Sequence, residues 1–138
     1  MKSIFFLSIF LLFSKNENCS KNSLKCSDFK SGKFELVNSK SKRKYIIKRN
    51  SEFQTEDTYA LESGKKISGP KIFKIRWIND CEYNLMIDTI KNKCDETDLY
   101  MNSKGGLNVK IIKVENNCAT LITSLEDMKV ESKLCKIK

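Results

Sequence analysis

The chain has 138 residues, a formal net charge of +9 at pH 7 and no histidine. The lack of histidine excludes Ser-His-Asp and Cys-His catalysis and every zinc site that needs a histidine ligand. Only Arg43, Arg49 and Arg76 of the 26 basic residues are arginines, whereas nucleic-acid and phosphate sites favour the planar guanidinium group. We therefore expect a lysine-rich soluble surface and no specific nucleic-acid partner.

The start of the chain has the pattern of a secretory signal peptide. Lys2 precedes an apolar run from Ile4 to Phe13, and Ser14 ends this run. The run is too short to span a membrane as a helix, so we predict a signal peptide over residues 1–14 and no transmembrane span. The polar segment that follows predicts a flexible lead-in over residues 15–31. The mature protein is then expected to be secreted or periplasmic.

From Gly32 onward, apolar and polar residues alternate in short runs. This alternation is typical of half-buried antiparallel strands. Asn79-Asp80, Asn116-Asn117 and Glu126-Asp127 mark turns between the runs. We predict about eight strands, at residues 32–38, 43–49, 53–61, 71–77, 82–88, 106–114, 118–125 and 128–137. Residues 89–104 form either a short helix or a wide loop.

The predicted fold is all-β and occupies one domain, residues 32–138. Strands joined in chain order by short turns favour an antiparallel up-and-down meander. Such a meander closes into a small, lipocalin-like barrel because closure removes exposed strand edges. A twisted open sheet is the alternative.

The cysteines predict a disulfide-stapled domain. An even number of cysteines in an exported chain indicates a disulfide framework. If Glu126-Asp127 is a two-residue turn, Cys118 faces Cys135 at a non-hydrogen-bonded position, where Cα atoms approach to about 4.5 Å. Cys26, before the first strand, and Cys81, after Trp77, form the second predicted pair. Cys19 and Cys94 remain as the third pair, and only the first pair has a geometric argument.

Cys19 is also the position where a bacterial lipid anchor would be attached. Lipoprotein signals place a small residue directly before the cysteine, close behind the apolar run, but Glu17 and Asn18 intervene here. Lipidation would also leave an odd number of cysteines. We therefore expect no lipid anchor at Cys19.

The segment of residues 77–83, WINDCEY, gathers unusual side chains around a turn. Asp80 and Glu82 are a pair of carboxylates, but the segment lacks a nucleophile if Cys81 is oxidised. Tight turns recruit these residue types in any case, so a capped, disulfide-held hairpin is the favoured interpretation. We assign no catalytic residue.

We also expect no metal and no cofactor. Asp95, Glu96 and Asp98 are the best candidate metal ligands in the chain. Their spacing does not match a calcium loop, and no glycine stands at the required turn.

Three segments carry a specific combination of residues. They are Cys26-x-x-Phe29-Lys30-x-Gly32-x-Phe34, then Ile47-x-Arg49-Asn50 with Gln54-x-Glu56, and Trp77-Ile78-Asn79-Asp80-Cys81-Glu82-Tyr83-x-Leu85. The combination resembles a family of small exported proteins of the Bacteroidetes, chiefly flavobacteria, without an assigned function. The resemblance covers residues from about 26 to 112 and implies the Cys26–Cys81 pair and a β-rich, lipocalin-like fold. The other four cysteines depart from the family pattern, so their pairing cannot be carried over.

Some members of that family carry a topoisomerase name. The chain gives this name no support, because it is short, begins with an export signal and has no glycine-rich nucleotide loop.

Arg49, Gln54 and Glu56 are candidates for binding the polar part of a ligand at a barrel mouth. Alternation puts Arg49 on the same face as Tyr45 and Ile47, which favours the barrel interior. Gln54 and Glu56 alternate with Phe53, which favours the outside.

Trp77 and Tyr83 complete the candidate ligand-binding set. With Phe34, Tyr45, Phe73 and Leu85 they form a candidate apolar lining for a barrel cavity. The alternative is that these side chains fill the core, which is common in small barrels.

A basic run is the candidate site for an anionic partner. It comprises Lys40, Lys42, Arg43, Lys44 and Lys48 and adjoins Arg49. Tyr45 is the only aromatic residue within the run, whereas binders of single strands present several stacking platforms. A solvated hairpin tip is the alternative.

The sequence therefore predicts a non-enzymatic binding module of the cell envelope. The first hypothesis is a small apolar or amphipathic ligand in a barrel cavity. The alternative is an interaction module that uses the basic hairpin 40–49 to hold an anionic polysaccharide, lipid headgroups or a protein partner. An enzyme is least favoured, because the usual nucleophile and acid/base sets are missing.

Overall fold

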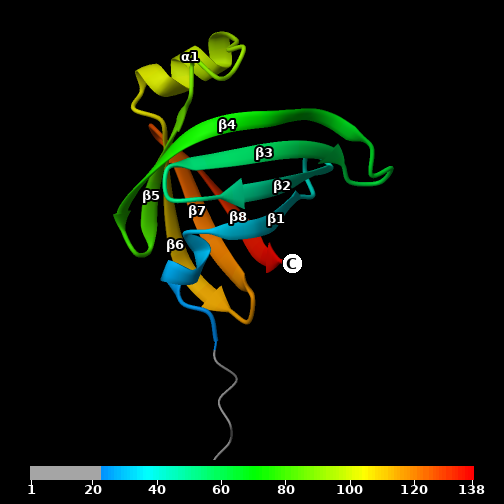
Figure 1. The fold of residues 1–138 in the computed structure, drawn as a ribbon, viewed down its shortest axis with the longest axis vertical. Helices are drawn as coiled ribbons and strands as arrows, with labels where there is room; N and C mark the ends of the chain where they lie inside the picture. Colours follow the sequence, from blue (N-terminus) through cyan, green and yellow to red (C-terminus); the bar gives the residue numbers. More distant parts are fainter. Residues whose placement is uncertain (1–22) are drawn as a thin grey trace, which may run out of the picture.

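The computed structural model describes residues 23–138 (Figure 1). The predicted signal peptide, Cys19 and the first part of the predicted lead-in lie outside these residues.

The described residues form a closed antiparallel barrel of eight strands. Each strand pairs with the next in chain order, and β8 pairs with β1. The predicted meander and its closure are therefore confirmed. The strands are β1 (Gly32–Asn38), β2 (Arg43–Arg49), β3 (Phe53–Ala60), β4 (Lys66–Asn79), β5 (Glu82–Ile87), β6 (Leu107–Glu115), β7 (Cys118–Leu125) and β8 (Met128–Ile137).

Strand β4 is longer than its pattern predicted, because it continues through Gly69 and Pro70. The β3–β4 register shifts opposite this point, between Glu56 and Thr58. Gly69 has φ +117°, and a Cβ there would lie 2.7 Å from the Glu56 carbonyl oxygen. A glycine in an irregular pairing therefore lets the strand continue through residues that the sequence left between the predicted strands 53–61 and 71–77.

Two short helices lie at the two ends of the barrel (Figure 1). The 3₁₀ turn η1 (Cys26–Phe29) precedes β1 and inserts Phe29, which is 0% exposed, into the core. The helix α1 (Glu96–Ser103) lies in the predicted helix-or-loop segment and covers part of the opposite end. Phe29, assigned from sequence to the lead-in, thus belongs to the core, and Cys26 packs against it.

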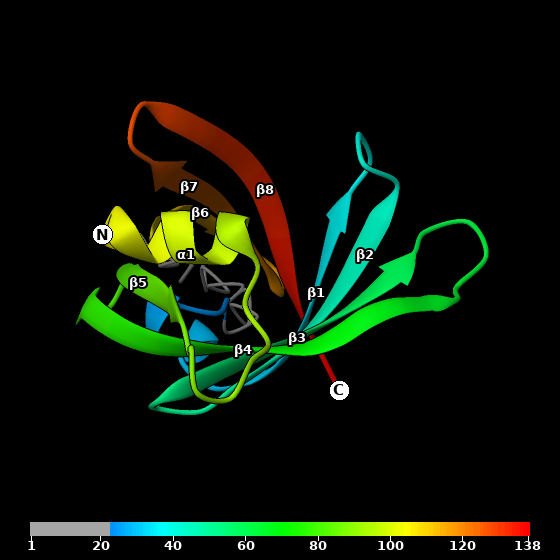
Figure 2. The same cartoon turned by 90° about the horizontal axis from the view of Figure 1, so that it is seen from above.

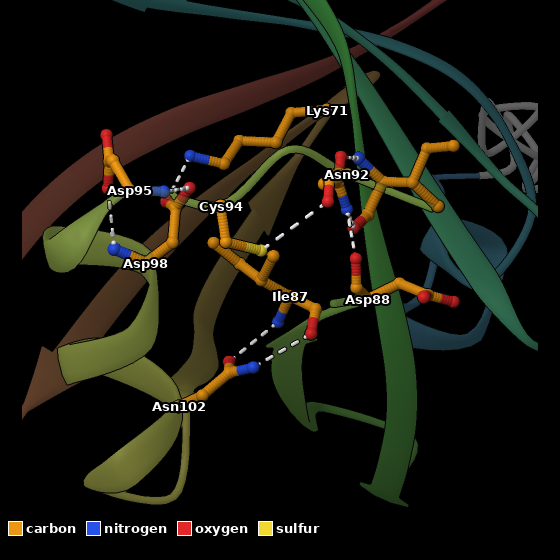
Figure 3. Close-up of polar contacts among 9 residues, drawn as sticks. Lys71, Ile87, Asp88, Asn92, Cys94, Asp95, Asp98 and Asn102 are labelled. Carbon is orange, nitrogen blue, oxygen red and sulfur yellow. Dashed lines mark hydrogen bonds and ion pairs between the residues drawn. The ribbon is translucent and has the colours of Figure 1, made fainter. Parts of the chain in front are cut away.

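Helix α1 is held by side-chain hydrogen bonds (Figure 3). Asp95 and Asp98 form a capping box at its N-terminus, and Asp98 also pairs with Lys71 of β4. Asn102 bonds to both backbone groups of Ile87, at 2.8 Å each. Two of the three acidic residues that were weighed as calcium ligands, Asp95 and Asp98, therefore cap and anchor a helix.

Two disulfides staple the barrel. Cys26–Cys81 joins η1 to the β4–β5 turn, and Cys118–Cys135 joins β7 to β8 with a Cα–Cα distance of 4.0 Å. Both predicted pairs are confirmed, and they indicate folding in an oxidising compartment. Cys94 has no disulfide partner among residues 23–138, so its predicted bond to Cys19 stays a prediction. Within the same residues, no helix has the length and apolarity needed to cross a membrane.

Candidate ligand-binding cavity

A buried arginine organises the barrel interior near η1. The Arg49 side chain, at the end of β2, donates through Nε to Gln54 Oε1 at 2.6 Å and through Nη1 to the Phe29 carbonyl oxygen at 2.9 Å. Its Nη2 donates to the Tyr83 hydroxyl at 2.5 Å. Each guanidinium nitrogen therefore has a partner within the chain. The predicted inward orientation of Arg49 is correct, but the group is a structural clamp with its bonds already made.

Aromatic rings surround this guanidinium group. Its carbon lies 4.4 Å from the centroid of Tyr83 and 5.3 Å from that of Phe34. The Trp77 ring packs on Tyr83 with centroids 4.6 Å apart. These contacts supply cation–π stabilisation to a charge that has left water. Trp77 Nε1 is buried and has no hydrogen-bond partner within residues 23–138.

Gln54 and Glu56 point into the barrel, and the opposite expectation is wrong. Gln54 is 1% exposed and stands directly opposite Arg49 in the β2–β3 pairing. Paired residues share a face, so Gln54 must accompany Arg49 inside. The sequence reading placed Phe53 inside and thereby shifted the whole strand by one residue, which reverses every side chain.

Glu56 connects the Arg49 network to open space. Gln54 Nε2 donates to Glu56 Oε1 at 2.7 Å, which gives a chain from Arg49 through Gln54 to Glu56. Glu56 lines a small inner cavity of about 80 Å³ and also a cavity of about 330 Å³ at the barrel mouth below α1. Leu107 lines both as well. These two residues therefore stand where the cavities meet.

The mouth cavity has an apolar wall and a few polar groups. Its apolar side chains are Tyr45, Phe73, Ile87, Met101 and Leu107, and its charged ones are Glu56, Lys71 and Asp98. Lys71 and Asp98 pair with each other, which leaves Glu56 as the carboxylate without a basic partner at bonding distance among the described residues. The arrangement suits a small molecule with an apolar body and a polar end.

Burial acts on the titration of two groups here. Burial raises the pKa of the Glu56 carboxyl, and the hydrogen bond from Gln54 and the charges of Arg49 and Lys71 offset only part of this rise. Burial likewise raises the pKa of the Tyr83 hydroxyl, opposed by Arg49. The Glu56 carboxyl at the floor of the mouth cavity is therefore more easily protonated than a carboxyl in water.

The candidate ligand residues form one connected group, but only part of it reaches a cavity. Arg49, Gln54, Glu56 and Tyr83 all line the inner cavity. Trp77 lies against Tyr83 and does not line either cavity. The five candidate residues lie close together because β2, β3, β4 and β5 are neighbouring strands of the barrel.

The candidate basic run is divided between the two ends of β2. Lys40 and Lys42 lie at the exposed β1–β2 turn, where Lys42 pairs with Glu62. Lys44 lies 3.9 Å from Glu35, and the exposed Lys48 lies near the other end of the strand. Arg43 begins the strand and is half-buried. Four of the five residues therefore lie at the β1–β2 end of the strand, and Lys48 is separated from them along β2.

Lys71, Met101 and Leu107 contribute to the mouth cavity and were not singled out from sequence. Lys71 and Leu107 stand near the starts of the predicted strands 71–77 and 106–114, and Met101 lies in the predicted helix-or-loop segment 89–104. The one signal for these residues in the sequence was Met101, an apolar residue in the polar helix-or-loop segment 89–104.

No family model, curated protein or solved structure matches the chain. The resemblance to exported Bacteroidetes proteins therefore stays a prediction.

Proposed function

We propose that this protein is a secreted or periplasmic, non-enzymatic binding module that holds a small amphipathic molecule in the mouth of its barrel. The observation that carries the proposal is the cavity of about 330 Å³ below α1, with an apolar wall and Glu56 at its floor. Its volume lies at the lower end of the usual range for ligand sites, about 300–1,000 Å³. The occupant is therefore small.

The polar groups of the cavity favour one orientation of the ligand. Glu56 lies at the meeting point with the inner cavity, while Lys71 and Asp98 lie together between β4 and α1. A ligand with its polar end at Glu56 places its apolar body against Phe73, Ile87 and Met101. Such a ligand buries apolar surface of its own and of the cavity wall. Each Å² of apolar surface buried contributes about 25 cal/mol to the free energy of binding.

Phenylnaphthylamine, a neutral dye whose emission rises in apolar surroundings, tests the cavity. We expect saturable binding at one site. Leu107→Phe places a larger side chain where the two cavities meet. It should weaken dye binding about tenfold, because the phenyl ring occupies space that the dye needs. Ile112→Phe is the matched control, since Ile112 lies on the same strand and is 52% exposed.

The dye experiment has a clear opposing outcome. Near-ultraviolet circular dichroism first establishes that both variants keep native packing. Equal dye affinity for Leu107→Phe, Ile112→Phe and the wild type would place the dye elsewhere and contradict the proposal.

A further inference from the structure

The barrel closure between β1 and β8 is incomplete along its length. The two strands pair from Lys33↔Ile137 to Leu36↔Leu134. The next pair in register, Val37 with Lys133, is not formed. Beyond it, β1 runs to Asn38 and β8 begins at Met128. In Figure 2, β8 and β1 lie together at one end and separate toward their turns. We call this gap the seam.

The seam leaves backbone hydrogen-bonding groups of β8 without a strand partner among residues 23–138. Cys118 and Cys135 face each other at 4.0 Å between Cα atoms, the spacing of a non-hydrogen-bonded pair, so the odd-numbered residues of β8 aim their backbone groups away from β7. At Cys135 these groups meet Glu35 of β1. At Lys133, Glu131 and Lys129 no strand meets them. Three residues therefore present both an N–H and a C=O along one free edge.

The seam is also a groove with exposed apolar side chains. A cavity of about 300 Å³ lies between Val37–Lys40 on one side and Lys129–Ser132 on the other. Met128 and Val130 are 67% and 56% exposed, although they share the face of the fully buried Leu134. The wall of the barrel has opened here, so core-facing positions of β8 are left in water.

The β7–β8 turn, at the start of β8, contacts α1. Glu126, in the β7–β8 turn, accepts from the Tyr100 hydroxyl at 2.6 Å and lies 3.1 Å from Lys104. Both partners belong to α1 or its C-cap. These contacts hold the β7–β8 turn against α1.

The charges of the seam are mostly basic and unpaired. Lys40 and Lys129 line the groove with Glu131, and Lys133 stands at its inner end. None of these four makes an ion pair within residues 23–138, although seven such pairs form elsewhere in that part of the chain. The groove therefore complements a segment that carries carboxylates.

We propose that the seam binds an extended acidic peptide from a partner protein, which adds to the edge of β8 as a strand. Free backbone groups supply the hydrogen bonds of strand addition, and Val130 and Met128 receive alternate apolar side chains. A single strand suits the seam because residues of β1 bound its far side. The β8 strand of a second copy carries β7 on its other edge, and that strand would meet the β1–β2 hairpin.

A fluorescein-labelled peptide that alternates valine with glutamate serves as the probe in an anisotropy titration. We expect saturable binding, and slowed amide exchange at Lys129 and Glu131 in the complex. The same peptide with N-methyl groups on alternate residues should bind about tenfold more weakly, because it cannot complete the edge hydrogen bonds. A version with lysine in place of glutamate should lose a similar factor.

Variants of Glu131 test the same point from the protein side. Glu131→Pro removes an N–H that faces the seam and leaves the β7 ladder intact, so we expect a folded protein and about tenfold weaker peptide binding. Glu131→Ala is the matched control, which keeps the N–H and should bind at least as well as the wild type. Leu107→Phe should leave peptide binding unchanged, which separates this site from the proposed ligand cavity.

Three outcomes would overturn the proposal. The first is equal affinity for the plain and N-methylated peptides. The second is equal affinity of Glu131→Pro and Glu131→Ala variants. The third is absence of peptide binding together with a concentration-dependent dimer in sedimentation that Glu131→Pro abolishes, because the occupant is then a second copy of this chain.

Discussion

Arg49 shows how one residue can serve as a structural centre of a small barrel. Its guanidinium group joins η1, β3 and β5 through Phe29, Gln54 and Tyr83. A buried charge without such partners would cost several kcal/mol, so the aromatic and polar surroundings of Arg49 are a requirement of its burial. Glu56 stands at the far end of the same chain of hydrogen bonds, and it is the member of that chain that lines the mouth cavity.

Replacing Glu56 by glutamine should change the pH dependence of stability. The native pKa of Glu56 is raised above its ordinary value of 4.5, so the folded protein keeps a proton that the unfolded chain has already released. Its contribution to the free energy of unfolding therefore falls as pH rises from about 4.5 through the native pKa. Glu56→Gln removes this loss and can still accept the hydrogen bond from Gln54.

Urea unfolding from about pH 4 to 8 measures this effect. The stability of the Glu56→Gln variant relative to the wild type should increase with pH and then level off. Glu52→Gln, a change at an exposed turn residue, controls for the loss of one charge. Parallel stability curves for the wild type and Glu56→Gln would contradict the raised pKa.

At the scale of elements, two asparagines take the place of missing strand neighbours. The β5–β6 pairing ends at Leu85↔Leu107, and beyond it the Asn102 side chain bonds to the N–H and C=O of Ile87. Asn92 likewise bonds to both backbone groups of Ile72, at 2.8 and 2.6 Å. The Asn102 amide satisfies both backbone groups of the buried Ile87, whereas the Ile72 carbonyl also accepts from the Asp88 N–H at 3.0 Å.

Removing the Asn102 amide should loosen α1 and destabilise the fold. Asn102→Ala leaves both backbone groups of the buried Ile87 without a partner, so we expect a loss of about 1–3 kcal/mol in the free energy of unfolding. Ser103→Ala is the neighbouring control, because Ser103 is exposed and bonds only to Tyr100 of its own helix. It should cost under about 0.5 kcal/mol.

Chemical denaturation and amide exchange of α1 provide the measurements. Exchange of the helix should accelerate in Asn102→Ala and not in Ser103→Ala. A similar small effect of both changes would show that α1 is held by its other contacts, chiefly the Lys71–Asp98 pair.

At the scale of the whole molecule, the two disulfides stabilise one end of the closed barrel. Cys118–Cys135 crosslinks neighbouring strands at the barrel end that carries η1, and its cysteines have a sequence separation of 17. Cys26–Cys81 spans 55 residues and ties η1, with its buried Phe29, to the β4–β5 turn. The opposite end has neither crosslink and contains both the mouth cavity and the seam. Both proposed binding sites thus lie at the end of the barrel that these two crosslinks leave free.

The longer crosslink should contribute more stability. The entropy lost by the unfolded chain grows with loop length, which gives about 4 kcal/mol for the 55-residue loop and about 3 kcal/mol for the 17-residue loop. We expect the paired change Cys26→Ala with Cys81→Ala to lower the urea midpoint more than Cys118→Ala with Cys135→Ala. The reverse order would show that fixing the edge of the β7–β8 hairpin outweighs loop closure.

The pattern of alternation was sufficient for the path of the strands. The ends of β1, β2, β7 and β8 agree with it to the residue, because each is bounded by a short polar turn that alternation alone locates. The Cys118–Cys135 pair followed from counting across such a turn. Predictions based on neighbouring residues were less secure wherever the chain departs from regular pairing, at Gly69-Pro70 and at residues 89–104.

Alternation predicted the orientation of only some residues of the candidate site. Arg49 was placed inside correctly, but Gln54 and Glu56 were placed outside because Phe53 was taken as an inward residue. A polar side chain enters a core when a buried partner satisfies it, and that partner belongs to another strand. The sequence alone does not contain this pairing.

The sequence by itself determined an all-β chain, the order and antiparallel direction of its strands, and the Cys118–Cys135 disulfide, because these depend on local periodicity and turn length. The tertiary structure decided the rest. The insertion of Phe29, the clamp around Arg49, the cavity below α1 and the seam beside β8 all depend on how strands distant in the chain meet when the barrel closes. Closure fixes which polar groups find partners and which remain open to a ligand, and no local pattern records that outcome.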